Sequence, residues 1–339
     1  MLIINPYRFV SVSPPAAAFV SNWDTTKTGT GSSSDTSIKI PTYNGGTYDC
    51  VVDWGDSTFS TITTWNDAAW THDYGVGNGG LKTIRITGQF WGLRFNNTGD
   101  RLKLLSVASF GSNFRLGNTN SYFYGCSNLT TIAADLSLSS VTSMQNMFNN
   151  CTSLTSLDVS SWNVSSVTNM TYMFQGCTSL TALDVSSWNV SSVTNMSYMF
   201  QSCTSLTSLD VSSWNVSNVT TMTYMFQSCT SLTSLDVSSW TVSSVTNMQN
   251  MFNSCTSLTS LDVSGWNVSN VTTMQYMFTH ANMTNTKYSD TLNAWSLLTL
   301  KPNVNFGAGP MKYNAGAVAA RAILTSSPNN WTVTDGGPA

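Results

Sequence analysis

Glutamate is absent from this 339-residue sequence, and all 16 acidic side chains are aspartates. Charged residues make up 9% of the chain, and histidine occurs twice, as His72 and His280. So few carboxylates and imidazoles leave few general acids or bases for catalysis. The sequence also lacks a glycine-rich phosphate loop, a Cys-x-x-Cys pair and a His-Glu-x-x-His motif. We therefore predict that the protein is not an enzyme and needs no cofactor or metal.

Basic residues are missing from the centre of the chain. Between Cys126 and Phe278 there is no lysine or arginine, whereas six aspartates occur there. Such a surface repels phosphate backbones, so we expect no nucleic-acid partner. No apolar run reaches the ~18 residues of a membrane span, so we expect no membrane insertion. Pro6, Arg8 and Pro14 interrupt the start of the chain, which therefore lacks the apolar core of a signal peptide.

A repeat of 26 residues is the main feature that the sequence does contain. One copy reads CTSLTALDVSSWNVSSVTNMSYMFQS, from Cys177 to Ser202, and five copies keep almost every position. Cysteine, aspartate, tryptophan and phenylalanine each recur at this interval, and a shortened copy begins at Cys126. A fixed period of this size is typical of a solenoid, in which each copy forms one coil and the coils stack.

Hydrophobic spacing within a copy predicts one short strand and one short helix. Leu183 and Val185 lie two residues apart and share one face of a strand, so Asp184 points outward. Residues 196–203 place Met, Met, Phe and Cys at i, i+3, i+4 and i+7, which is one stripe of a helix about two turns long. We expect this helix to pack back onto the strand.

The repeat resembles that of the BspA-like bacterial surface proteins, a class of leucine-rich-repeat solenoids with copies close to LxxLDxSxWxxSxVTxMxxMFxxC. The resemblance covers nearly half of the chain. It implies parallel strands stacked from coil to coil. It also implies a role in adhesion, because the family consists mostly of surface proteins of bacteria and proteins of the phages that infect them.

The aspartate row is the first half of the candidate binding face. Strands of neighbouring coils lie about 4.8 Å apart, where two carboxylates repel each other by about 0.8 kcal/mol in water. The row must therefore be solvated, hydrogen-bonded by Ser, Thr or backbone N–H groups, or bridged by cations. Calcium is the alternative here and near Asp53 and Asp56, although one carboxylate per coil is few for an ion that takes about 6–8 oxygens.

The tryptophan row is the second half of that face. Each ring follows the strand at a corner of the coil, where the rings either stack structurally or lie half exposed as a strip for glycans. The candidate ligand-binding residues are Trp162, Trp188, Trp214, Trp240, Trp266, Asp158, Asp184, Asp210, Asp236 and Asp262.

The repeated cysteines are predicted to be free thiols. Equivalent cysteines in stacked coils have parallel Cα–Cβ bonds, so their Cβ atoms stay near the coil spacing, beyond the ~3.8 Å of a disulfide. We expect them to fill the core as small apolar groups. The paired methionines of each copy are expected to pack beside them rather than bind metal.

Residues 21–110 show short strand patterns separated by Gly and Asn clusters. The segments VDWGDST, starting at Val52, and WTHDYG, starting at Trp70, resemble the PKD-type β-sandwich domain. The resemblance implies a tight turn at Gly55, with His72 packed nearby. An acid–base or metal site around His72 is the alternative to this structural role. The expected strands are Ser37–Ile40, Tyr48–Trp54, Leu81–Thr87 and Phe90–Phe95.

The repeat pattern ends after Phe278, and the remainder is predicted to cap the solenoid with one helix beginning after Asn314 and a final strand from Trp331. The predicted fold class is α+β: a PKD-like β-sandwich, then a leucine-rich-repeat-type solenoid with parallel strands, then a C-terminal cap. The predicted boundaries are an N-terminal arm over 1–20, the sandwich over 21–110, the solenoid over 111–285 and the cap over 286–339.

Together these features predict an adhesion protein. The NPYRF segment near the start resembles phage structural proteins, which implies a tail fibre, tail tip or head-surface component at the virion surface. We expect it to bind a host-surface glycan or protein through its repetitive face, to contact other virion proteins and to form a homo-oligomer. A bacterial cell-surface adhesin and a tail-spike-type glycan hydrolase are the alternatives. If the tryptophan row is structural, the receptor site would lie in the loops of residues 21–110 or in the cap.

Overall fold

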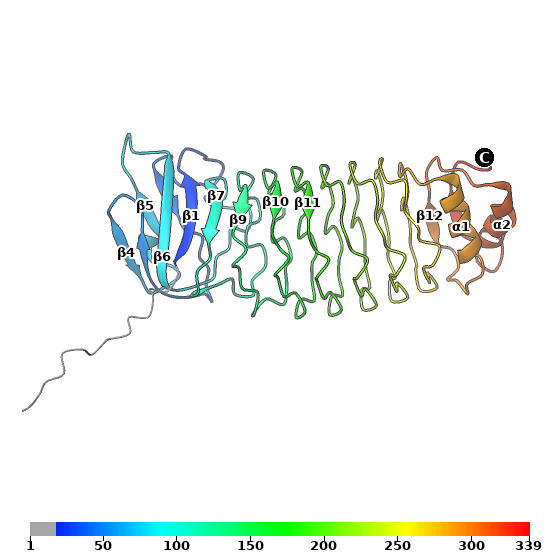
Figure 1. Ribbon diagram of the computed structural model, residues 1–339, viewed down its shortest axis with the longest axis horizontal. Coiled ribbons are helices and arrows are strands. Elements are labelled where there is room, and N and C mark those ends of the chain that lie inside the picture. Colours follow the sequence, from blue (N-terminus) through cyan, green and yellow to red (C-terminus); the bar gives the residue numbers. More distant parts are fainter. Residues whose placement is uncertain (1–17) are drawn as a thin grey trace, which may run out of the picture.

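The computed structural model describes residues 18–339, so most of the predicted arm over 1–20 lies outside the described residues. A β-sheet occupies one end of an elongated body, a row of coils forms the middle, and two helices lie at the far end (Figure 1). The hydrophobic core is continuous from the sheet through the coils to the helices.

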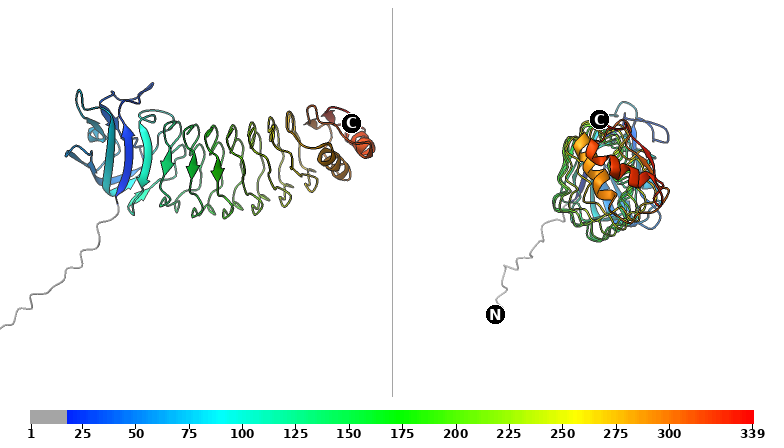
Figure 2. Two further views of the ribbon diagram at one scale, coloured as in Figure 1. Left: turned by 45° about the horizontal axis from the view of Figure 1, so that its top comes forward. Right: turned by 90° about the vertical axis from the view of Figure 1, so that its right-hand side faces the viewer.

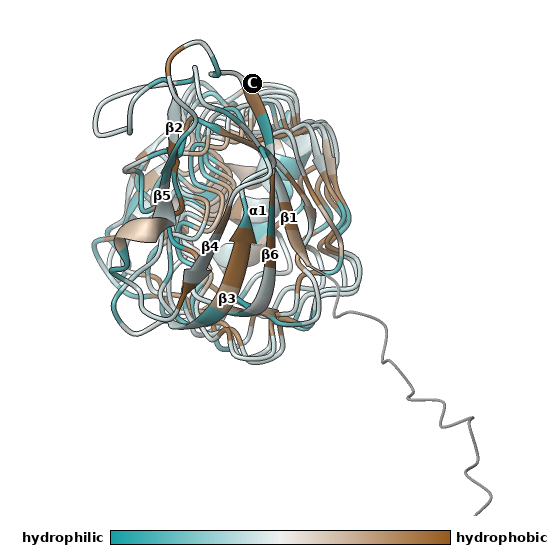
Figure 3. Ribbon diagram, turned by 90° about the vertical axis from the view of Figure 1, so that its left-hand side faces the viewer, coloured by the Kyte–Doolittle hydropathy of each residue, from teal (hydrophilic) through white to brown (hydrophobic). Residues whose placement is uncertain are grey.

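Among the described residues, seven strands form the sheet at the N-terminal end, in the order β4-β3-β6-β1-β7-β9, with β8 paired to β6. Figure 3 shows β4, β3, β6 and β1 side by side. Neighbours run antiparallel except the pairs β6–β8 and β7–β9. Alternate residues of β3 are buried, as expected for a sheet with one covered face. The strands are β1 (Phe19–Asp24), β3 (Thr47–Asp53), β4 (Phe59–Ile62), β6 (Leu81–Trp91), β7 (Leu104–Ser109), β8 (Phe114–Arg115) and β9 (Thr131–Ile132).

The second layer of the predicted β-sandwich is reduced to a two-stranded sheet, β2 (Ser37–Lys39) with β5 (Thr71–Asp73), which follows the 3-10 turn η1 (Ala68–Trp70). Its link to the larger sheet is aromatic. The Trp70 ring lies 5.3 Å from the Tyr48 ring, and the Tyr74 hydroxyl donates to the Trp54 carbonyl at 2.9 Å.

Each coil of the middle region lies against the next, with equivalent residues 26 apart (Figure 2). On one side the N–H of Thr181 donates to the carbonyl of Thr155, and the same bond recurs in the following copies. On the opposite side, isolated parallel bridges join Asn169, Asn195 and Thr221 in succession. The regular strands here are short: β9 pairs back to the sheet, while β10 (Ser156–Leu157) pairs with β11 (Ala182–Leu183).

The helix predicted over residues 196–203 does not form. Tyr198 and Ser202 have φ angles of 62° and 59°, in the left-handed region that interrupts a right-handed helix. The N–H groups of Met196, Tyr198, Phe200 and Ser202 donate to carbonyls of the next coil instead of to their own turn. A series of tight turns, rather than a helix, therefore directs the Met, Met, Phe and Cys side chains of each copy into the core.

The predicted α+β class, a β-sandwich followed by a leucine-rich-repeat-type solenoid with parallel strands, is wrong. The described chain is mostly β in several small sheets, and its two short α-helices both follow the repeats. A continuous parallel sheet through the repeats is missing from residues 18–339 because turns and single-residue bridges replace it. The reason is local. Strand pairing in each copy extends over at most two residues, after which the chain turns.

The C-terminal region closes the last coil with α1 (Asn285–Trp295), β12 (Asn305–Gly307), η2 (Ala315–Ala317), α2 (Val318–Thr325) and β13 (Thr332–Thr334). Strands β12 and β13 pair in parallel, and Phe306 bridges to Met274 of the last coil. Trp295 of α1 donates its indole N–H to the Val263 carbonyl at 3.3 Å. It thereby takes the next place in the tryptophan row and covers the open end of the core.

All seven cysteines are unpaired and buried, and the Cys177 thiol donates to the Phe148 carbonyl of the preceding coil at 3.2 Å. Burial raises the pKa of these repeat thiols well above the usual value. We therefore expect the native protein to be inert toward a thiol reagent such as DTNB and the unfolded protein to titrate seven thiols. Fewer than seven after unfolding without reductant would contradict the packing.

Candidate functional site

The five repeat tryptophans are buried, with exposed fractions between 1% for Trp266 and 4% for Trp162. Their rings form an offset stack, with centroids 6.2–6.3 Å apart and planes within 6° of parallel. From Trp188 onward each indole N–H donates to a valine carbonyl of the preceding coil, at 3.1 Å for Trp188 to Val159.

The repeat tryptophans are therefore not half exposed, as a row of rings that stacks on a glycan would have to be. The row consists of core residues that tie each coil to the one before it, because both the ring faces and the N–H groups are already used. The structural reading of Trp162, Trp188, Trp214, Trp240 and Trp266 fits this geometry, and a ligand face must be sought elsewhere.

The aspartate row lies at the surface. In Asp184, Oδ1 accepts hydrogen bonds from the backbone N–H of Ser186 at 3.1 Å and from its hydroxyl at 2.7 Å. The same turn recurs in every copy, and these bonds lower the pKa of Asp158, Asp184 and Asp236. Within residues 18–339, Oδ2 of Asp158, Asp184, Asp210 and Asp236 has no hydrogen-bond partner, so each coil presents one anionic oxygen to solvent.

Three of these carboxylates line an open groove of about 530 Å³ that crosses successive coils. Leucines at its floor are almost fully buried, and serine or alanine forms the second wall. The groove is negatively charged, because the repeat region holds no lysine or arginine. Its lining residues are Ser156, Leu157, Asp158, Ala182, Leu183, Asp184, Ser208, Leu209 and Asp210.

The last aspartate of the row accepts a cation from the cap. Lys287 of α1 places Nζ 2.6 Å from Oδ2 of Asp262, the oxygen that is open in the preceding copies. The hydrogen bond from Lys287, together with that from Ser264, lowers the pKa of Asp262 to about 2. An ammonium or hydroxyl donor can therefore occupy this position of a coil without disturbing the turn that orients the carboxylate.

The described residues contain no cluster of metal-ligating side chains. No group of three or more His, Cys or Asp side chains gathers anywhere in residues 18–339. Serine supplies the hydrogen bonds to Oδ1 of the repeat aspartates. The serine hydrogen bonds that the sequence predicted for the row are present, for example at Asp184 and Asp210.

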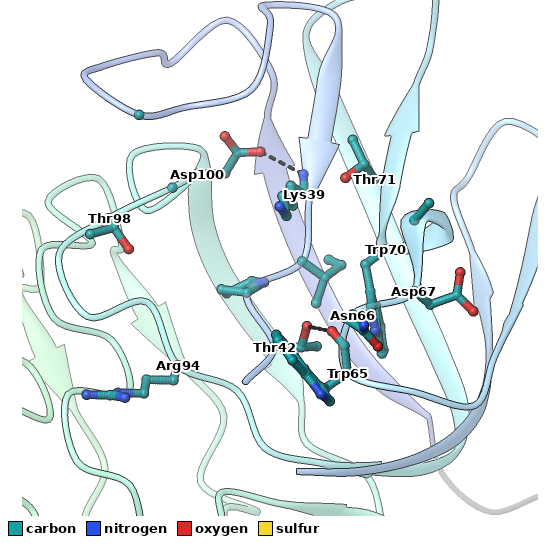
Figure 4. Close-up of a pocket in the computed structure, with 15 residues that line it drawn as sticks. Lys39, Thr42, Trp65, Asn66, Asp67, Trp70, Thr71, Arg94, Thr98 and Asp100 are labelled. Carbon is teal, nitrogen blue, oxygen red and sulfur yellow. Dashed lines mark hydrogen bonds between the residues drawn. The ribbon is translucent and has the colours of Figure 1, made fainter. Parts of the chain in front are cut away.

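A second hollow, of about 410 Å³, lies in the loops of the N-terminal sheet (Figure 4). Trp65, 42% exposed, forms one wall, and its carbonyl accepts a hydrogen bond from the Thr42 hydroxyl at 2.7 Å. Lys39 and Arg94 bring positive charge to the lining and Asp67 and Asp100 bring negative charge, so the lining is mixed, whereas the groove over the coils carries aspartate alone.

His72, which the sequence offered as a possible catalytic group, is held by contacts that stabilise the fold. His72 Nε2 lies 2.7 Å from Asp56 Oδ2, and its ring stacks on Trp54 with centroids 5.0 Å apart. Partial burial alone would raise the pKa of Asp56, but hydrogen bonds from Thr58 and His72 lower it to about 2. The pair fixes the turn at Gly55, whose φ of 80° favours glycine, and it lines none of the hollows described above.

A half-buried aromatic ladder at the surface of the coils is made of tyrosine, which the sequence reasoning missed. Tyr172, Tyr198 and Tyr224 stack with ring centroids 4.4 and 4.6 Å apart, and Tyr276 continues the row after an asparagine. Their regular 26-residue spacing was a visible signal. It was hidden because position 198 fell on the polar side of the helix that was expected there.

A family model described as "Mycoplasma protein of unknown function, DUF285" matches the chain at residues 117–234 and again at residues 203–301. Together the two matches cover 117–301, which is 185 of 339 residues and more than half of the chain. A search of curated proteins found no match. No helix within the described part of the chain has the length and apolar character needed to cross a membrane.

Proposed function

Because the chain belongs to the DUF285 family, whose tandem repeats are related to BspA-like surface repeats, we propose that it is a surface adhesion protein. In this proposal the repeated outer face binds a host-surface glycan or protein. The PKD-like character of residues 21–110 belongs to the same proposal, with that region holding the repeats away from the surface that carries them.

The observation that carries the proposal is the contrast between core and surface of the coils. Inside, most positions are filled by Leu, Val, Met, Phe, Trp or Cys. Outside, the same Asp Oδ2 atom is offered once per coil along an open groove. A ligand that repeats along its length, such as a polysaccharide with hydroxyl or amine donors, can engage several coils at once, and weak contacts then add up to a useful affinity.

We propose a phage virion as the setting, on the resemblance of the NPYRF segment to phage structural proteins. In a tail fibre, tail tip or head-surface component, contacts with other virion proteins and with further copies of the chain would multiply the binding. The bacterial cell surface is the second setting, favoured by the family's description from Mycoplasma. Immunogold labelling of purified virions and of cells separates the two.

We also propose that binding occurs without catalysis. A retaining glycosidase needs two carboxyl groups about 5–5.5 Å apart, one of them holding a raised pKa. Hydrogen bonds from serine lower the pKa of Asp158 and Asp184 in the groove, which disfavours the protonated form that a general acid needs. Release of oligosaccharides from host polysaccharide by the purified protein would overturn this part of the proposal.

Changing Asp184 and Asp210 together to asparagine should reduce adsorption to host cells by about tenfold or more, because two charge-assisted hydrogen bonds are weakened. The melting temperature should change little, since an amide oxygen can still accept from the serine N–H. Adsorption of labelled protein measured against cell number provides the readout. Asp49→Asn, an exposed aspartate of β3, is the matched charge control. Equal adsorption by both variants would contradict the role of the groove.

A further inference from the structure

The tyrosine ladder ends at a pocket of about 300 Å³ between the last coil and the C-terminal strands. Gln275, Tyr276 and Thr279 of the coil form one side of it. Strands β12 and β13, which Figure 1 places beside the last coil, form the other. The lining residues are Gln275, Tyr276, Thr279, Asn305, Phe306, Gly307, Gly309, Thr332 and Thr334.

The ring of Tyr276 is the exposed aromatic surface of this pocket. It is 49% exposed, whereas Tyr172, Tyr198 and Tyr224 are partly buried because each ring covers its neighbour. On one side of Tyr276 the ladder is interrupted by Asn250. On the other side the cap supplies no ring where a further coil would have placed one.

Glycines of the cap allow the C-terminal strands to lie close against the last coil. A Cβ on Gly307 would lie 2.4 Å from the backbone N of Tyr276, and a Cβ on Gly309 would lie 3.0 Å from Cα of Thr279. The cap therefore approaches the last coil backbone to backbone, and both glycines line the pocket that forms at this junction.

Polar side chains without partners surround the ring. Within residues 18–339, the side chains of Gln275, Asn305, Thr332 and Thr334 and the hydroxyl of Tyr276 form no hydrogen bond. These amides and hydroxyls can both donate and accept. The pocket lining carries no charged side chain, which separates it from the aspartate groove and from the N-terminal hollow.

We propose that this pocket binds one neutral pyranose ring of a surface glycan. The apolar C–H face of the sugar would stack on Tyr276, and its hydroxyls would take up the free amide and hydroxyl groups, each of which matches both the donors and the acceptors of a sugar. The volume lies at the small end of ligand pockets and suits a single ring rather than a longer chain. The assignment rests on the proposed function for its setting.

The test uses the full-length protein and four methyl glycosides, those of glucose, galactose, mannose and N-acetylglucosamine, measured by saturation-transfer difference NMR. We expect at least one glycoside to bind saturably. Tyr276→Ala should weaken that binding at least about fivefold, and Thr332→Phe, which fills the pocket from an exposed strand position, should abolish it. Tyr198→Ala, whose ring lies between two others, is the matched control and should bind as the wild type does.

Binding of none of the four glycosides would overturn the assignment, as would unchanged binding by folded Tyr276→Ala and Thr332→Phe. Binding of tyrosine amide in place of every glycoside would also overturn it, because the occupant would then be a protein side chain. The result is separable from the adhesion proposal. A protein that binds a glycoside in this pocket but fails to adsorb to host cells would overturn adhesion alone, and the reverse would overturn the pocket alone.

Discussion

Replacing Trp214 by alanine should lower the free energy of unfolding by about 3–5 kcal/mol, the usual range for loss of a large buried aromatic ring. Trp214 is 2% exposed and stacks between Trp188 and Trp240 at 6.3 Å on either side. Its indole N–H also donates to the Val185 carbonyl at 3.1 Å, which would be left without that donor. Urea denaturation followed by circular dichroism measures the change.

Phenylalanine substitutions separate the hydrogen bond from the packing. Trp162 occupies the same place in its coil, but among residues 18–339 its indole N–H has no partner. Trp214→Phe should therefore cost about 1 kcal/mol more than Trp162→Phe, the net value of one hydrogen bond. Stability close to wild type for Trp214→Ala would mean that the ring does not belong to the core. The tryptophan row would then again be a candidate glycan-binding surface.

Lys103→Met should destabilise the N-terminal sheet by about 3–5 kcal/mol, because it leaves a buried carboxylate without its charged partner. The side chains of Lys103 and Asp100 have no exposed surface, and Nζ lies 3.4 Å from Oδ1 of Asp100. Nζ also donates to the carbonyls of Ser34 and Ser37 at 2.7 and 2.8 Å, fastening the loop before β2.

Lys39→Met is the control for this substitution, since Lys39 lies on β2 with an exposed side chain and should change stability by less than about 0.5 kcal/mol. Thermal unfolding monitored by near-ultraviolet circular dichroism, which reports on the packed aromatic rings of the core, compares the two variants. Equal melting temperatures for Lys103→Met and Lys39→Met would show that the ammonium group is solvated.

The period of the repeat and the inward residues could be predicted from sequence, whereas the local backbone could not. Met196, Met199, Phe200 and Cys203 are all buried, as their spacing indicates. The same spacing suits either a helix or a run of tight turns that face one way. The choice was decided by backbone bonds to the next coil and by the left-handed φ of Tyr198, neither of which has a marker in hydrophobic periodicity.

The candidate site shows a similar division. Asp184 alternates with Leu183 and Val185, so its exposure followed from strand periodicity, and the serine two residues ahead explains its hydrogen bonds. The burial of Trp188 could not be predicted from periodicity, because Val159, whose carbonyl accepts its indole N–H, belongs to the preceding coil. The pocket beside Tyr276 depends on how the cap docks, which no single repeat encodes.

The most direct test of the account removes whole coils. Deleting residues 204–229 joins Cys203 to Thr230 in the register of the repeat, and deleting 178–229 removes two coils in the same way. Affinity for purified host-surface polysaccharide is then measured by biolayer interferometry, with circular dichroism as the check on folding. If the repeated outer face binds the polymer, deleting one coil weakens binding by about three- to tenfold and deleting two weakens it by about ten- to hundredfold, since each coil contributes of order 1 kcal/mol. Unchanged affinity after both deletions would contradict it.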